Sequence, residues 1–161
     1  MSVRVYVPCT WSQLHDILVA GGVGPVPVPA HAVTGALRTA YPDAGEEEWE
    51  YAALTAAAQE AIGLVTDDDP PRRVVVAMDA ESMVPVEEPD PSTVQVDEVV
   101  PLRKVAAVHV DSEDAEETVA AAVKAWQAAQ DGDDEAVAAV DRCLDHELGW
   151  FAPQELDDLF D

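Results

Sequence analysis

The chain has 161 residues, of which 33 are Asp or Glu and only eight are Lys or Arg, so its formal net charge at pH 7 is −25. Nucleic acids and anionic membranes bind proteins through clustered basic side chains, and this composition therefore argues against both classes of partner. A basic protein remains a possible partner. The hydrophobic content of 48% is ordinary for a globular protein, so we expect one folded domain over residues 1–161.

The acidic residues are unevenly distributed along the chain. Residues 1–42 contain one acid against two bases, whereas residues 43–161 contain the other 32 acids against six bases. The first segment is too short for a domain, so we expect it to pack against the acidic remainder and to leave one weakly charged face. His31 lies in this weakly charged segment and is a candidate binding residue.

The cysteine usage and the hydropathy pattern favour a cytoplasmic protein. Cys9 and Cys143 lie far apart and show no disulfide framework spacing. No apolar run approaches the ~18 residues of a membrane span, and the N-terminus has no signal-peptide pattern. We therefore predict that both cysteines are free thiols in a reducing compartment.

The first third of the chain opens with a strand followed by a helix. Alternating valines predict a strand over residues 3–7. A Thr-x-x-Gln capping box at Thr10 predicts a helix that ends at Gly21. Over residues 23–29 prolines alternate with apolar residues, and proline donates no hydrogen bond to a β-ladder. We therefore predict an extended surface segment there rather than a central strand.

The middle of the chain mixes helices with strands. A short helix is predicted from Thr34 to Tyr41, followed by a longer one with acids in its first turn that loosens near Gly63. A strand is predicted over residues 72–78, where the consecutive Val74, Val75 and Val76 are apolar on both faces, which is typical of a central strand. Three more segments follow: a loop over 81–92, an edge strand over 94–100 and a strand over 104–110.

The last third is predicted to be helical from Ser112 onward. A second helix of this part ends at Gly149, and Pro153 starts a final short one. The order of elements predicts the α+β class, with a single mixed sheet of three or four strands packed with helices. Because helices connect the first strand to the central one, we expect those two strands to be parallel neighbours.

One cysteine pattern and one carboxylate pattern each resemble a functional motif, but both are incomplete. Cys9 lies between a strand and a capped helix, as in cysteine phosphatases, but the position six residues later is His15 instead of Arg. We interpret Cys9 as a buried structural residue. The alternating acids at 131–135 resemble an EF-hand start, but the Gly and Glu positions hold Ala136 and Arg142, so they are interpreted as helix-start acids.

Three residues form the candidate catalytic set. His109 and Asp111 share one face of a predicted strand, and a His–Asp pair can orient an imidazole for general-base catalysis. His146 is the third candidate, and Asp141 and Asp145, four residues apart on one helix face, are weak metal-ligand candidates. The sequence contains no Gly-x-Ser-x-Gly elbow beside them, so a structural role for each residue stays open. Whether the histidines converge depends on the fold.

Four basic residues form a candidate anion site. Arg72 and Arg73 precede one predicted strand, and Arg103 and Lys104 precede another. If those strands pair in parallel, the four cations gather at one end of the sheet. The alternative is internal pairing with nearby carboxylates.

Several segments together resemble a known family. They are Val5–Pro8, Ala30–Thr34, Glu50–Leu54, Arg73–Val76, Val108–Asp111 and Asp145–Leu148. The chain resembles a family of small, acidic actinobacterial proteins that share a domain of unknown function. The resemblance covers nearly the whole length and implies a bacterial cytoplasmic setting and a single domain, but no activity.

The function predicted from these observations is non-catalytic binding or regulation by a protein with an acidic surface. No Walker loop, dinucleotide fingerprint or zinc array is present, so no cofactor is predicted. The alternative is a small-pocket, hydrolase-like enzyme that uses His109 and Asp111 with His146. A third hypothesis is a nucleic-acid mimic, which requires acids spaced along one face like phosphates.

Overall fold

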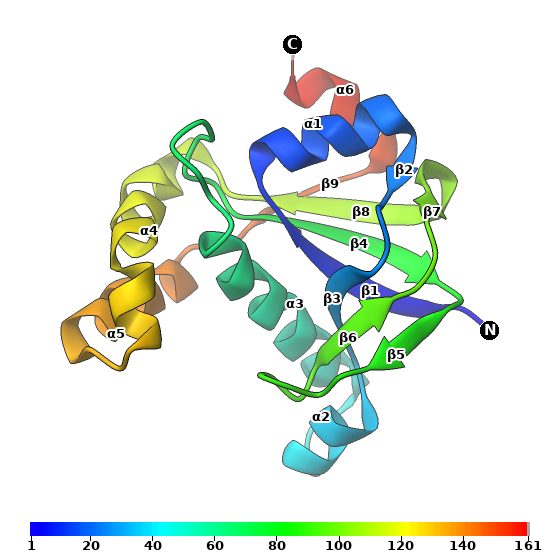
Figure 1. The fold of residues 1–161 in the computed structure, drawn as a ribbon, viewed down its shortest axis with the longest axis horizontal. Helices are drawn as coiled ribbons and strands as arrows, with labels where there is room; N and C mark the ends of the chain where they lie inside the picture. Colours follow the sequence, from blue (N-terminus) through cyan, green and yellow to red (C-terminus); the bar gives the residue numbers. More distant parts are fainter. Residues whose placement is uncertain (161) are drawn as a thin grey trace.

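A seven-stranded antiparallel sheet forms the centre of the computed structural model, which describes residues 1–160 (Figure 1). In spatial order its strands are β5 (Met83–Pro85), β6 (Thr93–Val96), β3 (Val28–Ala32), β1 (Val3–Cys9), β4 (Val74–Ala80), β8 (Val105–Val110) and β9 (Gly149–Phe151). A separate small ladder joins β2 (Gly22–Val23) to β7 (Val100–Pro101).

Helices connect these strands and cover the sheet. The α-helices of residues 1–160 are α1 (Trp11–Ala20), α2 (Gly35–Ala40), α3 (Glu46–Ile62), α4 (Glu116–Gln130), α5 (Asp134–Asp141) and α6 (Leu156–Leu159). Short 3-10 helices are η1 (Leu102–Lys104), η2 (Glu113–Ala115), η3 (Arg142–Asp145) and η4 (Pro153–Glu155). None of the helices in this described part is both long and apolar enough to cross a membrane.

The sheet divides the core into two layers. Alternate residues of a strand point to opposite faces, so Val7 and Val76 pack toward α1 and α6, whereas Tyr6 and Val75 pack toward α3. Figure 1 shows α1 and α6 together on one side of the sheet and α3 on the other. The residues of α3 that are buried against the sheet are Ala53, Ala57 and Ala58, whose small side chains let the helix lie close to the strands.

The predicted opening of the chain is confirmed. Thr10 Oγ1 accepts the N–H of Gln13 (3.1 Å), and Gln13 Oε1 accepts the N–H of Thr10 (3.0 Å). Gly21 ends α1 at φ 80°, in the left-handed region that favours glycine. Strong local signals therefore placed β1 and α1 correctly.

The α+β class is confirmed, but the predicted sheet of three or four strands with parallel neighbours is wrong. The main sheet has seven strands, and β1 pairs with β4 in antiparallel register, from Val3 opposite Ala80 to Cys9 opposite Val74. The reason is β3, which reverses the chain before α3. Because α3 then returns the chain to the end of the sheet where β1 stops, β4 begins there and runs opposite to β1.

Three strands of the main sheet were not predicted from the sequence. The proline-rich segment contributes β3, an interior strand in which Val28 and Ala30 are buried while Pro29 is exposed. The predicted loop over 81–92 contains β5, so β6 is covered and is not the edge strand. Gly149 does not end a helix; α5 stops at Asp141, and Gly149 begins the edge strand β9.

Candidate functional site

β1 and β3 pair over two residues and then separate, and a cavity of about 470 Å³ lies between their diverging ends. The last paired residues are Tyr6 and His31. Beyond them Pro8 and Pro29 have no N–H, so neither can donate a hydrogen bond that would continue the ladder. We call this space the fork cavity; it is lined by residues 7–9, 13, 16, 17, 20, 22–25, 28, 29, 60 and 64.

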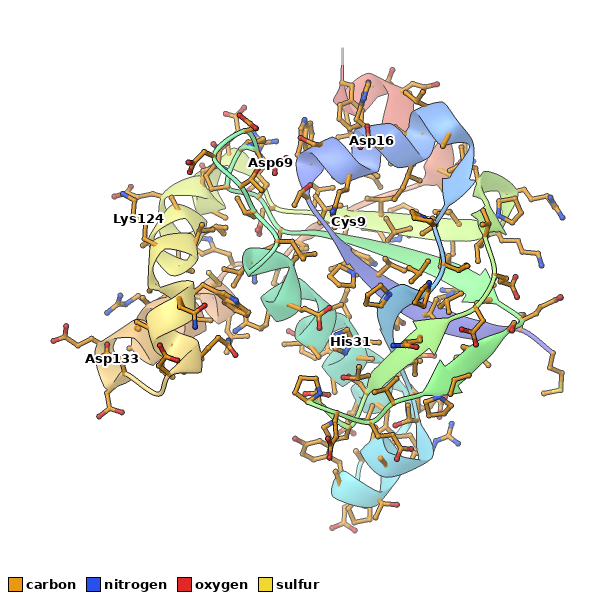
Figure 2. The ribbon with its side chains drawn as sticks, in the orientation of Figure 1. Cys9, Asp16, His31, Asp69, Lys124 and Asp133 are labelled. Carbon is orange, nitrogen blue, oxygen red and sulfur yellow. The ribbon has the colours of Figure 1, made fainter. Side chains whose placement is uncertain are left out.

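The walls of the fork cavity are mostly apolar. Among the described residues that line it, only Gln13, Asp16 and Glu60 have polar, non-thiol side chains, and none is Lys, Arg or His. Cys9 contributes a fully buried thiol whose pKa burial raises to about 12, so this side chain is a neutral part of the wall and not a nucleophile. Figure 2 shows Cys9 at the end of β1 and Asp16 above it on α1.

A buried hydrogen-bond network positions Glu60 beside the fork cavity. His31 is 2% exposed, and its Nδ1 lies 2.7 Å from Ser92 Oγ, whose hydroxyl donates to Asp90 Oδ1 at 2.6 Å. The other ring nitrogen, Nε2, lies 3.3 Å from Glu60 Oε1. Because the Ser92 hydroxyl has one proton and gives it to Asp90, the Ser92 contact needs a donor at Nδ1 of His31. His31 therefore holds Glu60 in place.

His31 was a predicted binding residue, but its partners were not predicted. Glu60, Asp90 and Ser92 come from α3 and from the segment before β6, and no motif links these positions in the sequence. The one available signal is Asp90 two residues before Ser92, a spacing that favours an Asx turn, and Asp90 Oδ1 does accept the N–H of Ser92 at 2.9 Å.

The predicted catalytic residue Asp111 is occupied by an internal salt bridge. Arg73 donates to both Asp111 oxygens, through its backbone N, Nε and Nη2, each at 2.8 Å. The side chains of Arg73 and Asp111 are 2% and 0% exposed. Because its oxygens face the guanidinium, Asp111 does not orient His109, and the expected His109–Asp111 pair is corrected.

His109 and His146 line one cavity of about 280 Å³, between α3, β8 and the segment that leads to β9. His146 Nε2 lies 3.1 Å from Thr118 Oγ1, and its main-chain oxygen accepts from Arg73 Nη2 at 2.9 Å. His31 does not join them: β1 and β4 separate β3 from β8, a distance of about 14 Å at the usual strand spacing. Two of the three histidines thus share a cavity.

The burial of His109 gives a pH prediction. Burial lowers the pKa of His109 below the ordinary value of 6.5. The unfolded chain then binds this proton more readily, so stability is lost as pH falls through 6.5 and on through the lower folded pKa. A nuclear magnetic resonance titration of the His109 ring should give a midpoint below 6.5, and the variant His109→Gln should lose less stability than the parent on acidification. A midpoint at or above 6.5 would contradict this assignment.

The four predicted anion-site cations do not gather. β4 and β8 pair antiparallel, with Val74 opposite Val110 and Met78 opposite Val105. Arg72 and Arg73 therefore lie at one end of these strands, and Arg103 and Lys104 lie at the other. Three of the four are paired internally: Arg73 with Asp111, Arg72 with Glu116 (2.9 Å) and Lys104 with Glu81 (3.6 Å). The predicted anion site is therefore not formed, and the alternative, internal pairing with carboxylates, holds for three of the four cations.

The carboxylates near the last helices have structural positions. Asp133 Oδ2 accepts the N–H of Ala136 and caps α5, as expected for helix-start acids. Asp141 is the last residue of α5, and Asp145 lies in η3; both are exposed. Within residues 1–160 no group of three or more His, Cys, Asp or Glu side chains is placed to hold a metal ion.

The comparisons with known proteins give a family but no activity. Neither the curated proteins nor the solved structures include a significant match to the chain. The model of a family described as "Family of unknown function (DUF6912)" matches residues 3–160, which is nearly the whole chain. The predicted resemblance to a family of unknown function is thereby confirmed, and the chain belongs to this family.

Proposed function

We propose that this protein is a non-catalytic binding or regulatory protein that recognises a basic protein partner. The observation that carries the proposal is the internal use of its cations. Five of the eight Lys and Arg side chains form salt bridges with the chain's own carboxylates: Arg4, Arg38, Arg72, Arg73 and Lys104. The remaining surface is therefore dominated by carboxylates, whose summed field attracts basic partners and speeds their association.

The distribution of these acids supports a broad contact surface. Exposed acids concentrate at the start of α3, on η2 and the first turn of α4, and at the start of α5. Exposed Tyr51, Leu144 and Trp150 line the cavity that contains His109. Aromatic side chains are frequent anchors of protein interfaces. The surface thus offers both carboxylates that can steer a basic partner and apolar side chains that can anchor it.

A pull-down at two ionic strengths tests the proposal. The full chain is immobilised, exposed to lysate at about 50 mM salt and washed at about 500 mM salt. We expect basic proteins to be retained at low salt and released at high salt. An unrelated acidic protein of equal net charge is the control. Retention of no protein, or retention of the same set by the control, would overturn the proposal.

A second candidate function is a small-pocket, hydrolase-like enzyme. It is favoured by one observation, the shared cavity of His109 and His146. Asp111 no longer serves as the orienting carboxylate, so the two histidines alone carry this candidate. Activity against a panel of activated esters that disappears in His109→Gln would support it, and activity unchanged in that variant would not.

The setting of the protein is part of the proposal. We propose a cytoplasmic protein that binds neither nucleic acid nor membranes and uses no cofactor. The acidic composition supports the first two exclusions. Both cysteines are free and buried, which suits a reducing compartment.

A further inference from the structure

We propose that the fork cavity binds an organic cation with an apolar body, the chemistry of a Lys or Arg side chain together with its aliphatic stem. The inference rests on the proposed function and deepens it, because it identifies where a basic partner would insert a side chain. It is carried by three properties of the cavity: its apolar walls, its polar groups and the helix ends that border it.

The size and the walls of the cavity suit an apolar body. Its volume of about 470 Å³ falls within the range of small-ligand sites. Ile17, Val23 and Val28 are buried side chains that line it, and Pro8 and Pro29 line it just beyond the last paired residues of β1 and β3. Prolines supply main-chain acceptors but no N–H donors. A ligand group that donates hydrogen bonds is therefore matched better than one that only accepts them.

The charged groups of the cavity are carboxylates. Asp16 is exposed on α1, and no hydrogen bond or salt bridge of its side chain is found within residues 1–160. Glu60 contacts His31 through Oε1 alone, at 3.3 Å, which leaves Oε2 as an acceptor. Since no cationic side chain lines the cavity in the described part of the chain, a bound cation would supply the missing positive charge.

Two helices also end at the cavity. The lining residues Ile17 and Ala20 belong to the last turn of α1, and Glu60 and Leu64 belong to the end of α3 and the turn after it. Helix C-termini carry partial negative charge and usually attract a basic side chain. Neither α1 nor α3 has a basic residue in its last turn. Neither helix therefore supplies, from its own last turn, the positive group that its end favours.

Binding of a probe cation to the full chain tests the proposal. We choose 2-phenylethylamine, with the uncharged 2-phenylethanol as its near-isostere, and follow amide chemical shifts. The amine should give saturable shifts at Ile17, Val23 and Val28 with a Kd of about 1 mM, and the alcohol should bind at least about tenfold more weakly. No saturable shift of these amides up to about 10 mM amine, or equal binding of the alcohol, would overturn the proposal.

Three variants test whether the amine binds in the fork cavity or to the acidic surface in general. Asp16→Asn should weaken amine binding about threefold to tenfold, because it removes one partly solvated charge contact. Asp131→Asn removes an exposed acid at the end of α4, away from the cavity, and should leave the affinity unchanged. Ala20→Phe adds a ring at the exposed end of α1 and should block the site. Equal affinities of all three variants would contradict the assignment.

The two proposals fail in different ways. If a basic partner is retained in the pull-down and Asp16→Asn and Ala20→Phe retain it equally, the proposed function stands and the fork cavity is not its site. If the amine binds as expected but no partner is retained, the cavity is a site for a free organic cation and the partner proposal fails. A peptide containing Arg, compared with the same peptide containing citrulline, distinguishes a side-chain ligand from a free amine.

Discussion

The variant Asp111→Asn is expected to lose about 3–5 kcal/mol of unfolding free energy, the usual cost of removing one partner of a buried ion pair. Asp111 accepts three hydrogen bonds from Arg73, and neither side chain is more than 2% exposed. The amide of Asn cannot accept all three bonds, and the Arg73 guanidinium would keep its positive charge without a counter-ion. Burial of an unpaired charge has no compensating solvation.

The Arg4–Asp79 pair provides a matched control on the surface. It joins the same two residue types at 2.8 Å, but its side chains are 42% and 39% exposed. Asp79→Asn should therefore cost less than about 1 kcal/mol. The double variant Arg73→Met with Asp111→Leu removes both charges and should recover most of the loss. Urea unfolding measures all three; a loss below about 1 kcal/mol for Asp111→Asn would contradict the prediction.

The same salt bridge explains why the catalytic hypothesis was incomplete. Sequence periodicity correctly placed His109 in a strand, but that strand, β8, ends at Val110, and Asp111 follows it. Periodicity could not show that Arg73, 38 positions away, would occupy both carboxylate oxygens. Arg73 also donates to the main-chain oxygen of His146, so it connects the start of β4, the end of β8 and the segment before β9. Pairing between distant segments decides which polar groups remain available to a ligand.

The fold was predictable where signals are local. The capping box at Thr10 and the two-sided apolar run at 74–78 each correspond to an element of the structure. β3, β5 and β9 were missed because they are five residues or fewer and two of them contain proline. Such segments become strands only through pairing with neighbours from elsewhere in the chain. The direction of β4 was predicted wrongly because β3 was not predicted. An additional strand reverses the direction of the chain, and with it the direction of the strands that follow.

The fork cavity shows the same limit at the level of the site. Its prolines are visible in the sequence, where they argue against a central strand. In the structure, Pro29 lies within β3, and Pro8 and Pro29 stand where the ladder between β1 and β3 has ended. The prediction that these prolines donate no hydrogen bond to a ladder was therefore correct. Its structural result, however, is a cavity beside an interior strand. That consequence requires the positions of both strands, which only the fold supplies.

Gly63→Ala is expected to destabilise the protein by about 1–3 kcal/mol through overpacking. A methyl group at Gly63 would lie 2.6 Å from Cε2 of Trp126 and closer still to its Nε1, an overlap that requires the indole to move. Trp126 packs against the cluster of Ile62, Val119 and their neighbours between α3 and α4, so it cannot move without disturbing that cluster. The backbone at Gly63 has φ −69°, which alanine adopts readily. A loss of stability would thus arise from the contact and not from the backbone.

Two comparisons make this prediction specific. Gly35, the first residue of α2, has no atom within 4 Å of the position that a methyl group would take, so Gly35→Ala should be neutral or stabilising by up to about 1 kcal/mol. In a Trp126→Leu background the clash is removed, and Gly63→Ala should cost about 1 kcal/mol less than in the parent chain. Chemical unfolding of the parent, the three single variants and the double variant measures both effects. Equal losses for Gly63→Ala with and without the indole would show that the two residues are not coupled, and that the close approach of α3 to α4 does not depend on glycine at this position.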